Sequence, residues 1–350
     1  MLFIFIIFFA ISIFAFKFKT KDQKNILAVE CFLLAIIAGW RENFWPDTFV
    51  YVISFRNFTN GIVDFSPLDK PYGYGEMGFY YLGVIVKTFT DNEQVYLACI
   101  AGLSMFFLYK GISKYSIYPL IGICAYLVRF YAVRDLSQIR SGLAYSIIIS
   151  GLYLVHEKKL LRFVLFIWIV SWIHKSAWIA LPFYFFCNTV KITNTRIKIW
   201  LVIAFVLGTF FQGPISSFVT DNADDLSVTT YTQGQYVEEA LGMANPMIYF
   251  QCLLLLLYTS MEDKLAPVTT YYYTIRAGYL YSTLILITFC SFTALSGRTS
   301  TMFATLEFCI IPSLLNVFPK SQRMGLSFLV GLFLLAVLLL KIRGEALFVI

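Results

Sequence analysis

Long apolar runs recur along the whole chain, and they restrict the folds that are open to it. The runs at 1–16, 77–90, 95–109, 116–131, 271–290, 299–317 and 325–340 approach or reach the length that crosses a bilayer. Hydrophobic residues make up 59% of the sequence and charged residues 13%, which is more apolar surface than a water-soluble domain can bury. The sequence therefore predicts an all-α, polytopic helical membrane protein. We expect one integral membrane domain over 1–350, with roughly 10–12 transmembrane or re-entrant helices.

The charged residues lie mainly between the apolar runs, and their signs predict which side each loop occupies. Basic clusters at 17–24, 156–162, 191–198, 261–264 and 318–323 fit the cytoplasmic side under the positive-inside rule. The net charge of +7 follows from these clusters and does not indicate nucleic-acid binding. The two long polar loops, 41–75 and 212–245, are then expected outside. The seven cysteines lie within or beside apolar runs, which is typical of small buried residues rather than of a disulfide framework or a metal site.

The segment between the basic clusters at 156–162 and 191–198 has the length of about one span, yet both of its ends look cytoplasmic. A short helical hairpin with its apex at His174 and Lys175 fits this length and leaves both ends on the cytoplasmic side. Counting spans forward from the basic cluster at 17–24 and backward from the one at 156–162 also places 91–115 on opposite sides of the membrane. One segment between Arg41 and Lys191 must therefore be re-entrant, broken or wrongly assigned. Backbone that does not span is tolerated where it lines a protein-enclosed cavity.

Three arginines occur close together in "YLVRFYAVRDLSQIRSGLAYS": Arg129, Arg134 and Arg140. A charge at the membrane centre costs about 2.5–3.5 kcal/mol on insertion scales, so each needs a partner, an anion or a helix end. Asp135 can pair with one of them. Arg129 also fits a side chain that extends to the interface. Arg140 precedes small residues that favour close helix packing, so we expect it to begin a buried helix.

Four further charged positions stand beside apolar helices. Arg298, within "SFTALSGRTSTMF", fits either a capped helix start or an anion site. Arg41, with Asp47, fits an interfacial anchor or a ligand at the start of the outer loop. Glu76 opens an apolar helix and either complements its dipole or acts chemically. His174 is either an interfacial histidine near a tryptophan belt or a catalytic residue.

The order of these motifs resembles the EpsG family of polysaccharide polymerases, related in role to the Wzy O-antigen polymerases. The resemblance rests on "RENFWPDTFVY", "GYGEMGFYYLG", "QIRSGLAYSI", "WIHKSAWIALPFY" and "SGRTSTMFATLEFCIIP", which follow one another over most of the chain. It implies a membrane glycosyltransferase of GT-C-like architecture in the bacterial inner membrane, with its active site facing the periplasm. The implied substrate is an undecaprenyl-diphosphate-linked oligosaccharide, surrounded by membrane lipid, and a chain-length regulator protein stays open as a further partner.

The implied reaction transfers a glycan from a lipid diphosphate to an acceptor sugar hydroxyl. Arginines can stabilise the departing diphosphate without a metal or another cofactor, and a base must take the hydroxyl proton. The catalytic candidates are His174, Glu76 and Asp47. The substrate-binding candidates are Arg41, Arg134, Arg140, Arg298, Tyr51 and Lys175.

Other functional classes stay open from the sequence. A lipid-linked oligosaccharide flippase would use the same arginines to hold a moving diphosphate, although the internal repeats typical of transporters are not apparent. An O-antigen ligase shares the chemistry and differs in its acceptor. A membrane acyltransferase would want a histidine near an activated donor, and the second histidine, His156, lies in a basic loop. The sequence contains no P-loop, H-E-x-x-H, G-x-S-x-G or dinucleotide fingerprint.

Overall fold

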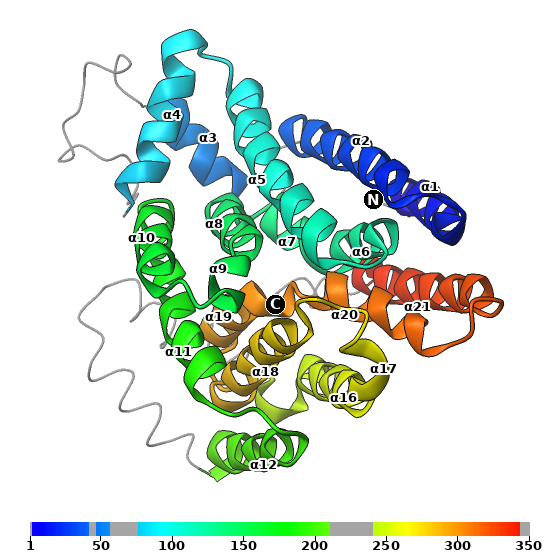
Figure 1. The fold of residues 1–350 in the computed structure, drawn as a ribbon. Coiled ribbons are helices and arrows are strands. Elements are labelled where there is room, and N and C mark those ends of the chain that lie inside the picture. Colours follow the sequence, from blue (N-terminus) through cyan, green and yellow to red (C-terminus); the bar gives the residue numbers. More distant parts are fainter. Residues whose placement is uncertain (1, 42–46, 57–75, 211–240, 344–350) are drawn as a thin grey trace.

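The computed structural model describes residues 2–41, 47–56, 76–210 and 241–343 (Figure 1). Within these ranges the chain is helical and contains no strand, which confirms the all-α class. Most of both predicted outer loops, 41–75 and 212–245, lies outside the described residues. In chain order the α-helices are α1 (Leu2–Ile13), α2 (Thr20–Gly39), α3 (Thr48–Arg56), α4 (Met77–Phe89), α5 (Glu93–Tyr115), α6 (Pro119–Tyr126), α7 (Ala132–Arg134), α8 (Ile139–Ser150), α9 (Tyr153–His156), α10 (Leu160–Ser171), α11 (Ala180–Thr189), α12 (Asn194–Phe210), α16 (Pro246–Ser260), α17 (Glu262–Leu265), α18 (Tyr272–Thr288), α19 (Thr293–Ala304), α20 (Glu307–Leu314) and α21 (Arg323–Arg343).

Three stretches of helix are long and apolar enough to cross a membrane by length and composition: 93–115, 139–156 and 323–340. The bent pair formed by 296–304 and 307–317 counts as a fourth if it is one span. Shorter apolar helices at 2–17, 77–89, 160–171 and 246–260 accompany them. The protein is therefore an all-α polytopic membrane protein in which short and broken helices are combined with full-length spans.

Helix α8 lies at the centre of the N-terminal half (Figure 1). Nearly all of its residues are buried, and it packs mainly against α5. The small residue Gly142 permits this burial, because a Cβ atom at that position would lie 2.7 Å from the carbonyl oxygen of Arg134. Arg140, the second residue of α8, therefore begins a buried helix, as the small residues after it indicated.

Helices α10 and α11 form a hairpin whose turn contains His174. Phe163 near the start of α10 stacks on Tyr184 in the middle of α11, with ring centroids 5.6 Å apart. The short 3₁₀ helix η5 (Lys175–Ile179) follows the turn. The turn also contacts α4, since the Phe79 amide donates to the Trp172 carbonyl at 3.2 Å. The hairpin thus places its turn at the start of α4.

Two helices are irregular inside the bundle. A π-helical turn, η4 (Leu127–Tyr131), connects α6 to α7 without a break in the chain's helical course. The α19–α20 pair bends by 47° between Ala304 and Glu307. Such irregularities release backbone groups and are frequent at functional sites. Both irregular regions contain charged residues, Arg129 in η4 and Glu307 at the bend.

The two ends of the described chain lie side by side, because α21 returns to pack against α1 (Figure 1). The rings of Phe9 and Phe328 stack at 5.9 Å. This contact joins the C-terminal half of the bundle to the N-terminal half, so the elements that carry the charged residues belong to one helical body.

Candidate active site

Glu76 is the point at which three distant segments meet. It is the residue before α4, and its Oε2 accepts a hydrogen bond from Arg140 Nη1 at 2.7 Å. Its Oε1 accepts from the backbone amide of Lys175 at 3.1 Å. The Glu76 side chain is 7% exposed and that of Arg140 is 28% exposed. Glu76 does not cap the amides of its own helix; it binds α8 and the hairpin turn instead.

His174 stands beside this ion pair at the turn of the hairpin. Its Nδ1 lies 3.8 Å from Glu76 Oε1, and a quarter of the side chain is exposed. The Ser176 amide donates to His174 Nδ1 at 3.1 Å, and Ser176 Oγ lies 2.9 Å from the same nitrogen. His174 therefore caps the start of η5 with its ring nitrogen.

Tyr145 of α8 connects this turn to α19. Its hydroxyl lies 3.0 Å from Ser176 Oγ and donates to the main-chain carbonyl of Arg298 at 3.0 Å. Thr301 Oγ1 donates to the same carbonyl at 3.0 Å. We call Glu76, Arg140, Tyr145, His174, Ser176 and Arg298 the Glu76 cluster; its members come from the residue before α4, from α8, from the hairpin turn and from α19.

The charges of the cluster act on His174. Burial lowers the pKa of His174 below its ordinary value, Glu76 raises it, and Arg140 and Arg298 lower it again. The net direction is downward, so the imidazole is neutral at neutral pH. The cluster thus combines two guanidinium groups, one carboxylate and one neutral imidazole.

Tyr51 and Lys175 lie next to the cluster in different ways. The Tyr51 ring is buried, and the Arg140 guanidinium carbon lies 5.9 Å from its centroid. The ring also meets Phe79 edge to face at 6.0 Å. Lys175 contributes its backbone amide to Glu76, while its side chain is exposed.

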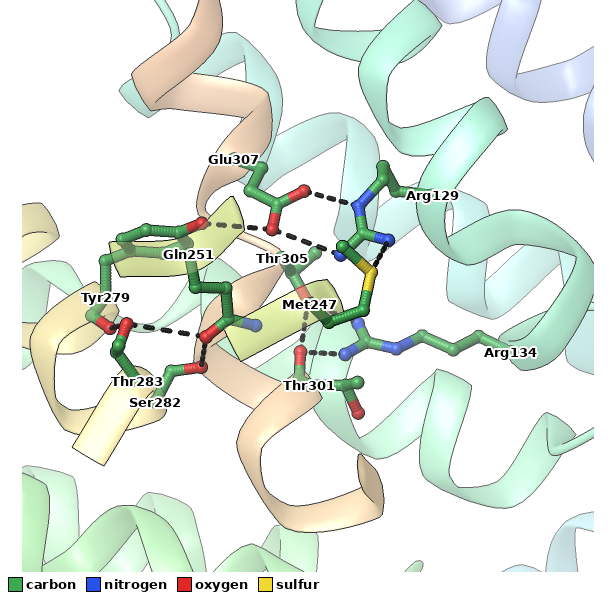
Figure 2. A network of polar contacts seen from close by, with 10 residues as sticks. All are labelled: Arg129, Arg134, Met247, Gln251, Tyr279, Ser282, Thr283, Thr301, Thr305 and Glu307. Atoms are coloured by element: carbon green, nitrogen blue, oxygen red, sulfur yellow. Dashed lines mark hydrogen bonds and ion pairs between the residues drawn. The ribbon is translucent and has the colours of Figure 1, made fainter. Parts of the chain in front are cut away.

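Arg134 lies in a second group of polar residues, shown in Figure 2. It is buried, and it donates to Thr305 Oγ1 and to the Thr301 carbonyl across the bend between α19 and α20. Its guanidinium carbon lies 5.1 Å from the centroid of Tyr145, which is its link to the Glu76 cluster. Arg134 was expected to bind the diphosphate of the substrate. In the structure its partners are protein groups at the bend.

Arg129 is paired inside the protein rather than extended to an interface. From the π-helical turn it donates to both oxygens of Glu307, at 2.8 and 3.4 Å (Figure 2). Tyr279 donates to Glu307 Oε1 at 3.1 Å, and Arg129 also contacts Met247 Sδ at 2.8 Å. Glu307 is fully buried. We call the ten residues of Figure 2 the Glu307 network.

Arg41 and Asp47 lie away from the contacts of the Glu76 cluster. Arg41 is buried and donates to Thr48 Oγ1 at 3.0 Å, to the Ala38 carbonyl at 2.7 Å and to the Asp135 carbonyl at 3.2 Å. It joins the end of α2 to the start of α3 and to the turn before α8, instead of standing at an exposed interface. Asp47 is half-buried in the turn that precedes α3.

Three residues of the Glu76 cluster differ from what the sequence predicted: Arg298 in its place on its helix, and Tyr145 and Ser176 in belonging to the cluster. Arg298 is the sixth residue of α19, so the interpretation of a helix N-terminal turn is wrong. Tyr145 and Ser176 were not predicted as site residues. The available signal for Ser176 was a hydroxyl two residues after a histidine in an apolar stretch.

Among the described residues, no group of three or more His, Cys, Asp or Glu side chains lies close enough to hold a metal ion. The seven cysteines are free, and four of them, Cys31, Cys124, Cys290 and Cys309, are buried. The polar side chains of the Glu76 cluster are one carboxylate, two guanidinium groups, two hydroxyls and one imidazole.

The fold and the Glu76 cluster define a multi-pass helical membrane protein that gathers two arginines, a carboxylate and a histidine among its helices. Comparison with protein families makes this more specific. The chain matches the EpsG family over residues 24–348 and therefore belongs to that family, a Wzy-like family of polysaccharide polymerases. Neither the comparison with curated proteins nor the comparison with solved structures returns a match.

Proposed function

We propose that this protein joins oligosaccharide repeat units carried on undecaprenyl diphosphate, at the periplasmic face of the bacterial inner membrane. The observation that carries the proposal is the Glu76 cluster, in which Arg140 and Arg298 stand with Glu76 and His174 in a chain of the EpsG family. Few charges occur within the apolar segments, and a gathered set of this kind in a membrane protein indicates a functional site.

The proposed reaction is a glycosyl transfer without a metal ion. A hydroxyl oxygen of the acceptor sugar attacks the anomeric carbon of the donor glycan, and the bond between that carbon and the diphosphate oxygen breaks. The diphosphate leaves with the bonding electron pair, and the hydroxyl proton passes to a base of the cluster, Glu76 or His174. Arg140 and Arg298 stabilise the charge that develops on the diphosphate. The ring of Tyr51 is buried, so its contribution is to support the Arg140 guanidinium, whose carbon lies 5.9 Å from the ring centroid.

The proposal is tested by deleting the gene and separating the surface glycan on a gel. Loss of a polymerase leaves single repeat units attached to the cell surface. Loss of a flippase leaves none, and loss of a ligase leaves polymer that is not attached. Normal polymer in the deletion strain overturns the proposal.

Replacing Arg298 with alanine is expected to reduce polymer formation by about 10²-fold, the usual loss when one preorganised group that stabilises developing charge is removed. The fold should persist, because Tyr145 and Thr301 bind the Arg298 main-chain carbonyl, which the substitution retains. Chain length on a gel, with membrane levels of the protein measured by blot, checks this. Arg298→Lys should recover part of the activity, and full-length polymer from Arg298→Ala would remove this residue from the mechanism.

Polymerisation is expected to continue as the pH falls through 6.5. Burial lowers the pKa of His174, so the imidazole becomes protonated only below its ordinary range. The charged groups that face it are Glu76, Arg140 and Arg298. Initial rates in membranes that contain lipid-linked repeat units should be measured from about pH 8 to about pH 5. The prediction is contradicted if the initial rate falls with a midpoint at or above about pH 6.5 and the His174→Gln variant no longer shows that fall.

A further inference from the structure

The Ser176 amide defines the hydrogen-bonding state of His174. A backbone N–H can only donate, and the peptide plane fixes the direction of its hydrogen. This amide donates to His174 Nδ1 at 3.1 Å, so Nδ1 is an acceptor and carries no proton. The hydroxyls of Ser176 and Tyr145 give no such information, because their hydrogens rotate to suit their neighbours.

A neutral imidazole has one proton for two nitrogens. Since Nδ1 accepts from the amide, the proton of neutral His174 is on Nε2. A protonated Nε2 has no in-plane lone pair for the proton of a sugar hydroxyl, and the lone pair of Nδ1 already accepts from the Ser176 amide. The imidazolium that any histidine base forms is also disfavoured by the burial of His174 and by the nearby Arg140 and Arg298. The opposite tautomer would bring the Nδ1 proton against the amide hydrogen of Ser176.

Glu76 remains as the acceptor of the cluster. Each of its oxygens receives one hydrogen bond, from Arg140 or from the Lys175 amide. A carboxylate oxygen accepts two hydrogen bonds, so both oxygens retain capacity to accept a proton. The carboxylate lies 3.8 Å from His174 Nδ1, so a sugar that reaches one of the two residues is close to the other.

We infer that His174 serves the glycosyl transfer as a hydrogen-bond donor through Nε2–H, directed at a sugar or phosphate oxygen, and that Glu76 is the base that takes the acceptor proton. Ser176 is the positioning residue that fixes the tautomer through its backbone amide. Tyr145 holds Ser176 against α19 through the Arg298 carbonyl. This inference rests on the proposed function for the reaction, but the tautomer itself does not.

The tautomer can be measured directly, because the chain contains only two histidines. In a His156→Gln variant, ¹⁵N-histidine labelling of the full-length protein in lipid nanodiscs leaves His174 as the single reporter. We expect Nε2 to show the shift of a protonated nitrogen and Nδ1 that of an acceptor, at pH 7. Ser176→Ala should keep this pattern, since it retains the amide. A spectrum with the proton on Nδ1 overturns the inference.

Activity separates a donor from a base. Glutamine carries an N–H near the position of histidine Nε2, so His174→Gln should stay within about 10-fold of the wild type. His174→Ala should lose about 10²-fold. Glu76→Gln should lose about 10²-fold or more, because an amide cannot take the proton. Melting curves in detergent identify any variant that fails to fold.

The outcomes distinguish a failure of the roles inferred for His174 and Glu76 from a failure of the proposed function. A His174→Gln variant as inactive as His174→Ala, at equal membrane level, overturns the donor role. A fully active Glu76→Gln variant overturns the role of Glu76 as base. If Arg298→Ala and His174→Ala both form normal polymer, the proposed function fails, while the spectrum still decides the tautomer.

Discussion

Replacing Arg140 with alanine is expected to reduce polymer formation by about 10³-fold, the largest loss among the single substitutions considered. The substitution removes a guanidinium that the proposed reaction uses against the leaving diphosphate, a loss of about 10²–10³-fold by itself. It also leaves Glu76, 7% exposed, without its ion-pair partner. The Glu76 carboxylate then loses the hydrogen bond that holds its Oε2 in place, so the base is less well positioned.

The measurement is glycan chain length on a gel together with the membrane level of the variant. Arg162 of α10 is the matched control, because it is exposed, and Arg162→Ala should give normal chains. Arg140→Lys should fall between the two, since lysine keeps the charge but loses the fork geometry. An Arg140→Ala strain with normal polymer would falsify the assignment of Arg140 to the site.

Breaking the Arg129–Glu307 pair should produce the largest loss of stability. Glu307→Leu removes the carboxylate that bonds the buried Arg129 guanidinium and the acceptor of the Tyr279 hydroxyl. Removing one partner of a buried ion pair costs about 3–5 kcal/mol. We expect a clear fall in the melting temperature of the protein in detergent and a lower level in the membrane.

A double substitution tests the cause of that loss. Arg129→Met combined with Glu307→Leu removes both charges and should recover most of the stability, because a hydrophobic replacement of a buried pair is often neutral. The exposed pair of Glu157 and Lys159 is the control, and Glu157→Leu should leave the melting temperature almost unchanged. If the double variant is as unstable as Glu307→Leu, the pair is not the source of the effect.

The sequence was sufficient for the fold class and for the members of the Glu76 cluster that carry charge. Apolar runs of membrane length predict helices because only they satisfy every backbone group in lipid. Glu76, Arg140 and His174 stood out because each interrupts an apolar context, where a charged or polar group needs a partner. That these residues would meet one another was expected only from the family resemblance, because no local pattern relates Glu76 to Arg140, 64 residues further along the chain, or to the hairpin turn at Lys175, 99 residues further along.

The positions of Arg129 and Arg134 could not be derived from helical periodicity. Five residues of a regular α-helix turn the chain through 500°, so the two side chains would lie about 140° apart. Both nevertheless reach the α19–α20 bend, at Glu307 and Thr305. The π-helical turn between them contains an additional residue per turn and brings positions five apart toward one face.

Tyr145 and Ser176 escaped prediction for a different reason. The chain contains 23 tyrosines, and most tyrosines in an aromatic-rich membrane protein lie in the core or at the lipid interface. The role of Tyr145 depends on α19 and the hairpin turn meeting beside α8, which is a tertiary feature. Ser176 donates to His174 through its backbone amide, and its hydroxyl two residues after a histidine was a weak signal for that contact, because any residue except proline has this amide.

The contact between α4 and the hairpin turn allows the geometry of the Glu76 cluster to be changed by a substitution at a residue outside the cluster. Gly78 lies so close to Trp172 that a Cβ atom would come within 2.7 Å of its carbonyl oxygen, and the next amide along the chain, that of Phe79, bonds to this carbonyl. The distance between Glu76 and the imidazole is therefore governed by two backbones in direct contact. Gly78→Ala should push the two backbones apart and lower the rate of catalysis, although it replaces no ionisable group.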